Sequence, residues 1–537
     1  MRTAYTAEQI RAAERVLMAR LPEGTLMQRA AAALAAVCAR TLGRVYGSRV
    51  AVLAGGGDNG GDALFAGARL ARRGARVTAI LASFRTHRAG LAALRAAGGR
   101  VVALTPADSG GGSGGAAALP EEAVRAVASA DLIVDGLVGI GGSGALREPY
   151  AGLARLANDA PGIVVAVDVP SGVDASTGCV PGAAVRADRT VTFGACKIGL
   201  LVDPGASHVG ALHVIDIGIG PYLPEPGVTA LTAADVADRL PRPAAESDKY
   251  RRGVVGVVAG SDRFTGAAVL AVGGAVRGGA GMVRYAGPAE PVRLVRARWP
   301  EAVTTILEPG DDVSGVGRVQ AWVLGPGMGT DDRAHALARS VLDTGLPTVL
   351  DADGLTLLAR DRSLLRPNLL LTPHAGELSR LLGVPAADIE ARRLEHVRRA
   401  AAELGVTVLL KGSTTLVAEP GRPVRVNPTG TPWLATAGTG DVLAGLAGAL
   451  LAGGLDTYDA GCCAAFLHGL AAHVAAAGPG GATEAAEAVL TTMLDAVAGA
   501  GTAGRADVPT APISAQDLPD ALPEALRLLE SPAKMEE

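Results

Sequence analysis

Aromatic side chains and cysteine are both scarce in this chain of 537 residues. Aromatic residues make up 3% of the sequence, which argues against a binding site built mainly from aromatic cages. The five cysteines form no CxxC pair, which argues against a disulfide framework and against a zinc site. The net charge of -3 leaves no excess of positive charge for binding a nucleic acid or an anionic membrane.

Lysine is scarcer still. Among 50 basic residues only Lys197, Lys249, Lys411 and Lys534 are lysines, a skew typical of a genome that favours arginine codons. Lysine and arginine differ in geometry and in ease of deprotonation. Each retained lysine is therefore a candidate for closer inspection.

Apolar residues and glycine are abundant. Hydrophobic residues make up 49% of the chain, which is enough for large cores, and the length suits two α/β domains. The N-terminus lacks the apolar core and cleavage site of a secretory signal. The uncharged stretch from Ala460 to Thr483 is interrupted by proline and glycine, which favours a buried helix over a membrane span. We expect a soluble, cytoplasmic protein.

Short apolar runs alternate with helical stretches in both halves of the chain, as in parallel sheets with crossover helices. The runs are Val50–Leu53, Val77–Leu81, Leu132–Val134, Ile163–Val167, Val254–Ala259, Ala321–Leu324, Thr348–Leu350, Leu369–Leu371 and Val406–Leu410. The proline-rich stretch 221–243 predicts a linker that runs into the start of the second domain. The glycine-rich stretch 108–118 predicts a flexible surface insertion.

In the first half, polar residues follow three of the predicted strands. The turn GGGDNGGDA carries Asn59 and Asp62 and opens a helix, where backbone amides can approach an anion. Asp135 and Asp168 each end a strand, and Ser171 follows closely. The oxygen-rich set suits a hard cation, whereas a tight turn and helix caps are the structural alternatives.

In the second half, GTGDVLAG at 438–445 predicts a glycine turn at a helix start, with Asp441 beside an acceptor hydroxyl. Lys411 ends a strand before a polar turn, and His374 and Glu377 follow another strand. A nucleotide site and a ligand site are the functional interpretations. The structural alternatives are a plain helix start, a solvated lysine and a structural histidine.

The first-half motifs GGGDNGGDA, VDGLVGIGGSGALREP and VDVPSGVDASTG resemble the YjeF-type N-terminal domain of NAD(P)H-hydrate repair enzymes, over about 7–220. The resemblance implies a Rossmann-like three-layer sandwich that interconverts the R and S epimers of NADHX and NADPHX. It implies potassium held by Asn59, Asp135 and Ser171. It implies hydrate contacts from Asp58, Asn59, Gly60, Gly61, Asp62, Gly139, Ile140, Gly141, Gly142, Ser143, Gly144, Ala145 and Asp168.

Asp168 is the candidate for proton transfer, since opening and reclosing the hydrate needs acid–base help, or else it only anchors the ligand. Two positions depart from the family pattern Asn-Asn-Gly-Gly-Asp-Gly: Asp58 replaces the first asparagine and Ala63 the last glycine. Asp58 adds a negative charge near a phosphate-bearing ligand. Lys197 is interpreted either as a phosphate contact or as a surface lysine.

The second-half motifs GPGMG, DADG, TPHAGE, KGSTT and GTGDVLAG resemble the ribokinase-like ADP- or ATP-dependent NAD(P)H-hydrate dehydratases, over about 227–530. The resemblance implies hydrate contacts from Ala267, Ala268, Gly329, His374 and Asp441. It implies nucleotide contacts from Lys411, Gly412, Ser413, Thr414, Thr415 and Gly440. It also implies magnesium, and ADP as the co-substrate that yields AMP and phosphate.

The sequence thus predicts a bifunctional repair enzyme, with an α/β Rossmann-like domain followed by a ribokinase-like α/β domain, active as a homo-oligomer. One alternative is a ribokinase-like small-molecule kinase with an accessory ligand-binding N-terminal domain. Another makes the first domain a non-catalytic scaffold. ADP versus ATP and NADHX versus NADPHX are left open.

Overall fold

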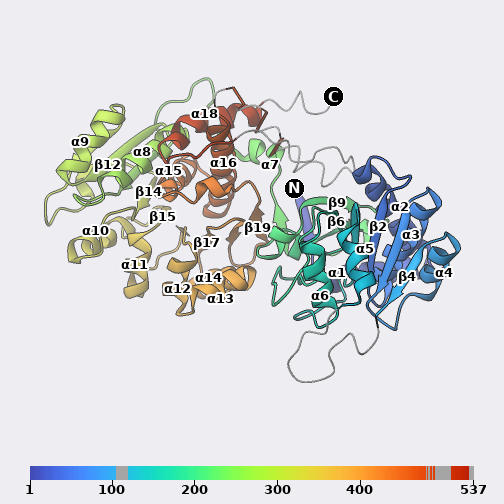
Figure 1. Ribbon diagram of the computed structural model, residues 1–537. Coiled ribbons are helices and arrows are strands. Elements are labelled where there is room, and N and C mark those ends of the chain that lie inside the picture. The colour runs from blue at the N-terminus through green and yellow to red at the C-terminus, as the bar shows by residue number, and fades with distance from the viewer. Residues whose placement is uncertain (105–118, 479, 482–483, 486–487, 490–509, 531–537) are drawn as a thin grey trace. The chain divides into compact units, whose positions relative to one another are not determined.

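The computed structural model describes residues 1–104, 119–478, 480–481, 484–485, 488–489 and 510–530 (Figure 1). The chain forms two compact units. Described residues 3–227 make up the N-terminal unit, and Met1, Arg2 and the described residues from Val228 onward make up the C-terminal unit. The insertion predicted at 108–118 lies outside the described residues.

A parallel sheet with the order β4-β3-β2-β5-β6-β7-β9 forms the centre of the N-terminal unit. Its strands are β2 (Arg49–Ala54), β3 (Arg76–Leu81), β4 (Arg100–Ala103), β5 (Leu132–Gly136), β6 (Ile163–Val167), β7 (Arg189–Phe193) and β9 (Ala211–Ile215). The direction of strand addition reverses between β2 and β5. In open α/β sheets, ligands bind beyond the carboxyl ends of the strands at such a point.

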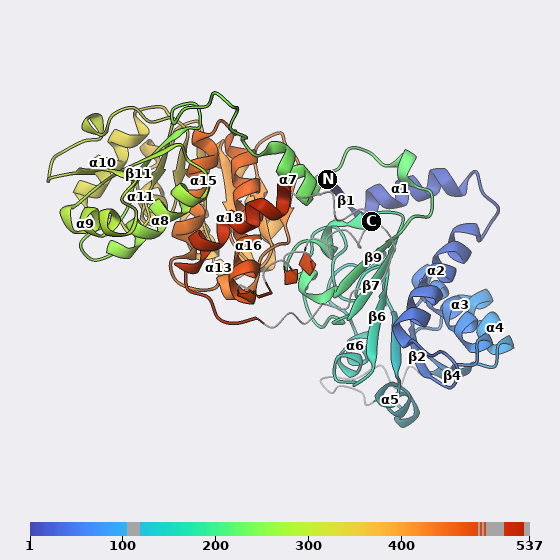
Figure 2. The same ribbon diagram turned by 90° about the horizontal axis from the view of Figure 1, so that it is seen from above.

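Helices cover both faces of this sheet, so the unit has three layers (Figure 2). The helices are α1 (Ala7–Met18), α2 (Thr25–Leu42), α3 (Asp58–Arg72), α4 (Arg88–Ala96), α5 (Glu121–Ala128) and α6 (Tyr150–Asn158). One core contains side chains of α2, α3 and α4, and the opposite core contains those of α5 and α6. A short parallel pair joins β1 (Arg2–Tyr5) to β8 (Cys196–Lys197).

The C-terminal unit contains a larger, mostly parallel sheet, in the order β13-β12-β11-β14-β15-β16-β17-β18-β19-β10. Its strands are β10 (Val228–Ala230), β11 (Val254–Val258), β12 (Met282–Gly287), β13 (Val303–Ile306), β14 (Ala321–Leu324), β15 (Thr348–Leu350), β16 (Leu369–Leu371), β17 (Thr407–Leu410), β18 (Thr415–Ala418) and β19 (Val424–Asn427). Only the pairs that β18 makes with β17 and β19 are antiparallel among these described pairings. The predicted α/β fold class is confirmed in both units.

Two apolar helices of the C-terminal unit, α8 and α15, pack very closely. The helices of this unit are α7 (Ala233–Arg239), α8 (Thr265–Arg277), α9 (Ala289–Arg298), α10 (Asp332–Leu342), α11 (Asp353–Arg360), α12 (Ala375–Leu382), α13 (Ala386–Ala391), α14 (Arg393–Leu404), α15 (Thr439–Ala452), α16 (Thr457–Ala477) and α18 (Asp517–Glu530). A Cβ atom at Gly274 would lie 2.2 Å from Val442 O, and one at Gly445 would lie 2.0 Å from Ala271 O. Glycine is therefore required at both contacts.

Helix α16 is long and apolar enough to cross a membrane, and no other helix of the described residues is. In its most apolar window, 83% of the residues are buried within the unit. The prediction of a buried helix in this stretch is confirmed for its described residues.

Candidate active sites

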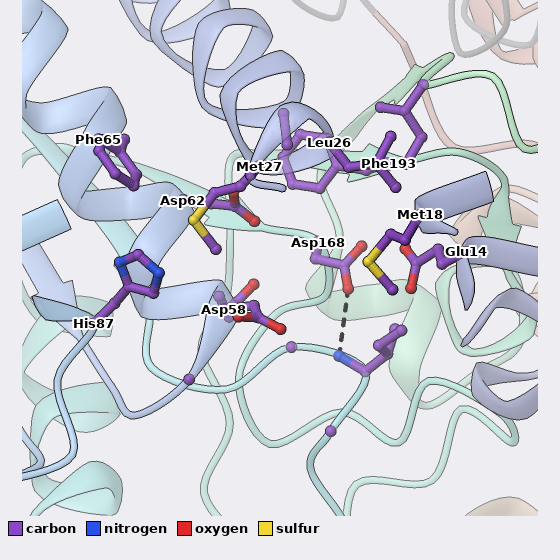
Figure 3. Close-up of a pocket in the computed structure, with 18 of the residues that line it drawn as sticks. Glu14, Met18, Leu26, Met27, Asp58, Asp62, Phe65, His87, Asp168 and Phe193 are labelled. Atoms are coloured by element: carbon purple, nitrogen blue, oxygen red, sulfur yellow. Dashed lines mark hydrogen bonds between the residues drawn. The ribbon is translucent and has the colours of Figure 1, made fainter. Parts of the chain in front are cut away.

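A large cavity opens at the reversal point of the N-terminal sheet. Its volume is about 1230 Å³, and the side chains in Figure 3 line it. The glycine turn between β2 and α3 forms one wall, with Asp58 and Asn59 on the first turn of the helix and Asp62 just beyond it. A Cβ at Gly55 would lie 1.8 Å from Leu137 O, so only glycine lets this turn approach the loop after β5.

The predicted hydrate contacts are only partly gathered at this cavity. Gly139, Ile140, Gly141 and Asp168 line it together with the α3 turn, whereas 142–145 are not among its lining residues. Gly60 and Gly61 are buried in the first turn of α3. Arg11 of α1 donates to Ile140 O at 2.7 Å, which ties the loop after β5 to the first helix.

Asp168 is held in a strained backbone conformation at the centre of the cavity. Its φ of 69° is rare for a residue with a side chain and costs about 1–3 kcal/mol. The carboxylate accepts from Lys197 Nζ at 2.5 Å and from Thr192 Oγ1 at 3.3 Å. It also accepts from the Ile140 amide at 3.3 Å, the hydrogen bond drawn as a dashed line in Figure 3. The cavity thus contains a carboxylate fixed by three donors.

Lys197 is a buried partner of Asp168 and does not lie on the surface. Its side chain is 1% exposed. Besides Asp168, it donates to Thr192 Oγ1 at 2.8 Å and to Phe193 O at 2.9 Å. Because these bonds use all three hydrogens of the ammonium group, the interpretation of Lys197 as a phosphate contact is wrong.

The three residues predicted to hold potassium lie together at the ends of β5 and β6. Asp135 is fully buried and accepts from the amide of Ser171 at 2.9 Å and from its hydroxyl at 2.7 Å. With its amide oriented to satisfy both ends, Asn59 donates to Val167 O at 3.1 Å and accepts from the Gly139 amide at 3.2 Å. Burial raises the pKa of Asp135 to about 6.

Two further carboxyl groups of the cavity have pKa values above their ordinary range. Burial raises the pKa of Asp62 well above normal, and the nearby carboxylates of Asp168, Asp58 and Glu14 add to the effect. Burial also raises the pKa of Glu14, against the attraction of Lys197. Glu14 was not among the residues predicted from the sequence. In the sequence it is one acidic residue in a charged helix, and nothing else marks it.

In the C-terminal unit, the predicted GTGD turn does open a helix. Gly438 has a φ of 91° and precedes α15, whose first turn carries Asp441. The buried His468 contacts Thr439 O through Nε2 at 2.9 Å, and burial lowers the pKa of this histidine to about 4. The neutral ring donates to that carbonyl and fixes the start of the helix.

Lys411 lies beside this helix start. Its Nζ is 2.8 Å from Asp351 Oδ1 and 3.7 Å from Glu377 Oε2, and a Cβ at Gly440 would lie 3.4 Å from the same nitrogen. Burial would lower the pKa of Lys411, but Asp351, Glu377 and Asp441 together raise it. The ammonium is therefore charged and faces the backbone of the GTGD turn.

Asp441 is the carboxyl group at this site that is poised near neutral pH. Burial raises its pKa to about 7, with the negative charge of Asp351 as the next cause. Asp353 raises this pKa as well, and its Oδ2 accepts from the amide of Gly329 at 2.9 Å. The glycine loop after β14 is thereby connected to the carboxylates around Asp441.

The segment that holds two of these carboxylates is strained. Ala352, between Asp351 and Asp353, has a φ of 49° and a ψ of -113°. This conformation is unfavourable for a residue with a Cβ. The strain sets the directions of both acidic side chains, as the φ of Asp168 does in the other unit.

Other predicted residues of this unit have structural partners of their own. His374 caps α12: its Nδ1 accepts from the Gly376 amide at 3.0 Å, and its side chain is 56% exposed. Ala267 and Ala268 lie at the start of α8, where Cβ atoms at Gly327 and Gly260 would come within 2.9 Å and 2.8 Å of them. These small residues let the loops after β11 and β14 approach the helix.

Arg393 is a residue of this site that the sequence did not reveal. Its side chain is 1% exposed and donates to the carbonyls of Leu410, Lys411 and Thr414 at 3.3, 2.9 and 3.3 Å. It therefore shapes the turn that contains Lys411, Gly412, Ser413, Thr414 and Thr415. Arg393 lies among several arginines on an ordinary helical pattern, so no sequence signal marks it.

Comparison with known families matches both units. Residues 23–199 match the family model of the YjeF-related protein N-terminus, and residues 255–493 match that of NAD(P)H-hydrate dehydratase.

Relatives match across both units. The bifunctional NAD(P)H-hydrate repair enzyme of Mycobacterium leprae is 45% identical over 490 residues, which cover 89% of this chain and 95% of the relative. The enzyme of the same name from Moorella thermoacetica is 37% identical, over 81% of this chain and 84% of the relative. A crystal structure of the Bacillus subtilis ADP/ATP-dependent NAD(P)H-hydrate dehydratase, co-crystallised with ATP and Mg2+, is 28% identical, covers 56% of this chain and 99% of that chain, and has a TM-score of 0.44.

The fold and the two sites define a two-domain α/β enzyme, with a Rossmann-like unit followed by a ribokinase-like unit. The chain belongs to the family of bifunctional NAD(P)H-hydrate repair enzymes. The two-domain repair enzyme predicted from the motifs is thereby confirmed, and the alternative of a small-molecule kinase is not favoured.

Proposed function

We propose that the C-terminal unit dehydrates the S epimer of NADHX or NADPHX with ADP, while the N-terminal unit supplies that epimer from the R form. The observation that carries the proposal is the juxtaposition of Asp441, with its pKa of about 7, and Lys411 at the start of α15. Phosphoryl transfer needs a carboxylate directed at a hydroxyl, fixed positive charge and oriented backbone amides. This helix start supplies all three.

In the proposed dehydration, Asp441 takes the proton of the C6 hydroxyl as the hydroxyl oxygen attacks the terminal phosphorus of ADP. An O–P bond forms, the bond from that phosphorus to the bridging oxygen breaks, and AMP leaves. The ring nitrogen then expels phosphate from C6, and transfer of the C5 proton to the released phosphate forms the C5=C6 bond of NADH. Lys411 and the amides of the GTGD turn hold the phosphate, and Arg393 holds the turn around Lys411.

Magnesium fits the charges at this site. The charges of Asp351, Asp353 and Glu377 all act on Asp441, with Lys411 as the cation among them. Such an excess of carboxylates suits a hard cation bound together with nucleotide phosphates. When bound, magnesium would neutralise charge on the nucleotide, and Asp351 and Asp353 are the residues that would hold it.

For the N-terminal unit, the donor set fits potassium. Asp135 is a fully buried carboxylate whose described partners are the neutral groups of Ser171 and Leu137. Burying such a charge without a cation is unfavourable. Asn59, Asp135 and Ser171 are the residues that would hold the ion, and its charge would orient the loops next to Asp168.

Potassium is expected to stabilise the N-terminal unit. A pKa raised from 3.8 to about 6 means that the ionised Asp135 costs about 3 kcal/mol in the fold. Folding therefore favours the protonated form of Asp135. The stability that this form contributes is present below pH 4 and is lost as the pH rises to about 6. At pH 7.5, KCl should therefore raise the Tm of this unit by a few degrees relative to choline chloride. In Asp135→Asn the two salts should act alike. Equal melting of the wild type in both salts would contradict the potassium site.

The test of the whole proposal is a single progress curve. Purified protein is incubated with mixed NADHX epimers, magnesium and either ADP or ATP, and regenerated NADH is followed by absorbance. We expect complete conversion, with ADP the better co-substrate. A reaction that stops when the S epimer is consumed would contradict the epimerase assignment. A phosphorylated product without NADH would contradict the dehydratase assignment.

The proposal also includes a cytoplasmic, homo-oligomeric enzyme that binds neither nucleic acid nor membrane. Its net charge of -3 supports the proposal that it does not bind polyanions such as nucleic acids.

A further inference from the structure

Asp62 is a buried carboxyl group that lines the N-terminal cavity. It is 9% exposed, lies on α3 just beyond the first turn, and lines the cavity, as Asp168 does (Figure 3). Its Oδ1 has no hydrogen-bond partner among the described residues. A buried polar atom without a partner is costly, and at a functional site it indicates a ligand or a reacting group.

The charged groups around the cavity act differently on Asp62 and on Asp168. Lys197 contacts Asp168 directly and keeps that carboxylate paired. The groups that act on Asp62 are Asp168 after β6, Asp58 on α3, Glu14 on α1 and Lys197 on β8, so the negative groups outnumber the positive one. Burial and these carboxylates thus raise the pKa of Asp62, while its neighbour Asp168 is ion-paired with Lys197. Two carboxyl groups in such different surroundings at one cavity indicate an acid and a base.

We propose that Asp62 is a catalytic residue of the epimerase reaction, namely the proton donor to the ring nitrogen N1, with Asp168 as the base for the C6 hydroxyl. This inference rests on the proposed epimerase function of the N-terminal unit. It assigns to Asp62 a step in the reaction, whereas the family motif assigns it only contact with the hydrate.

The two groups together complete a balanced reaction. Asp168 takes the proton of the C6 hydroxyl, the C6=O bond forms and the C6–N1 bond breaks. The electron pair of the broken bond goes to N1, which receives the proton of Asp62. Rotation about C5–C6 then turns the opposite face of the aldehyde to N1. N1 attacks C6, its proton returns to Asp62, and the proton on Asp168 returns to the oxygen. The configuration at C6 is inverted with no net change in protons or electrons.

Other acidic and basic groups at the cavity suit this role less well. Asp58 is exposed to solvent, and Glu14 is only partly buried. His87 has a structural task, since its Nδ1 accepts from the Gly90 amide at 3.1 Å and caps α4. Asp62 is thus the buried acid that lines the cavity and has an Oδ1 without a hydrogen-bond partner among the described residues.

The experiment measures R-to-S exchange of NADHX by chromatography, in the intact protein without nucleotide, from pH 5.5 to 9.5. Wild type should lose exchange activity at high pH as Asp62 deprotonates. Asp62→Asn should lower kcat by about 100-fold or more, with KM within about threefold, and should lack the fall at high pH. Asp62→Glu should regain part of kcat together with that fall. Asp159→Asn, at an exposed position of the same unit, serves as the control and should match wild type.

Unchanged kcat in Asp62→Asn, or a change in KM alone, would overturn the inference. If Asp62→Asn lowers the thermal transition temperature of the N-terminal unit, its loss of activity does not separate catalysis from folding. The pH profile of Asp62→Glu then tests the inference. A well-folded Asp62→Glu without the fall at high pH would also overturn it. Absence of exchange in the wild type would instead refute the proposed function, so the two failures are distinguishable.

Discussion

NADH formation is expected to fall about a thousandfold when Asp441 is replaced by asparagine. Asparagine keeps the shape of the side chain but cannot accept the hydroxyl proton, and loss of a general base typically costs 10²- to 10⁴-fold. The ionised form is the active one, so the wild-type rate should rise with pH through the pKa of about 7. This rise should be absent in Asp441→Asn. The measurement is kcat for NADH formation from S-NADHX with saturating ADP.

The epimerase unit is the internal control for this variant. Exchange of R- and S-NADHX should proceed at the wild-type rate in Asp441→Asn, since Asp441 belongs to the other unit. Loss of both activities together would refute the assignment of two independent sites. Retention of NADH formation would remove Asp441 from its role as the base.

Replacing Lys197 by methionine should abolish epimer exchange and strongly destabilise the N-terminal unit. The change leaves the Asp168 carboxylate buried without its cation, and breaking a buried ion pair from one side costs about 3–5 kcal/mol. Urea unfolding of the N-terminal unit gives the free energy directly. NADH formation from pure S-NADHX, measured in low denaturant, should be unaffected.

A second substitution separates charge from packing. Adding Asp168→Asn to Lys197→Met removes the unpaired charge and should restore much of the stability, but not the exchange activity. If Lys197→Met alone were as stable as wild type, the ion pair with Asp168 would not stabilise the N-terminal unit.

Short apolar runs predicted the central strands of both units, because parallel strands are buried on both faces and need no alternation. The runs at Val50–Leu53 and Ala321–Leu324 correspond to β2 and β14. Strands β7 and β9 were not predicted, since Arg189 begins the first and His213 lies in the middle of the second. Threonines at positions 190 and 192 are also buried there.

The candidate sites could be predicted where glycine and carboxylates follow a strand in a fixed pattern. Asp168 follows β6, and Asp441 follows the glycine turn that opens α15, and their roles as catalytic groups stay predictions. Arg393 could not be predicted, because its importance arises from three carbonyls that only the folded turn brings together. The same holds for the partner of Lys197, which lies 29 residues away in sequence.

The hydrogen-bond geometry of Lys197 limits which substitutions evolution can accept at this position. In a chain where all but four of the 50 basic residues are arginine, mutation has evidently favoured arginine codons. An ammonium group places three hydrogens around one atom, and Lys197 directs them to three acceptors at 2.5–2.9 Å. A guanidinium is planar and larger, and it cannot reproduce that arrangement in a site 1% exposed. Selection at this codon therefore works against the compositional bias of the whole sequence. In a relative, arginine at this position would mark an N-terminal unit that is no longer under that selection.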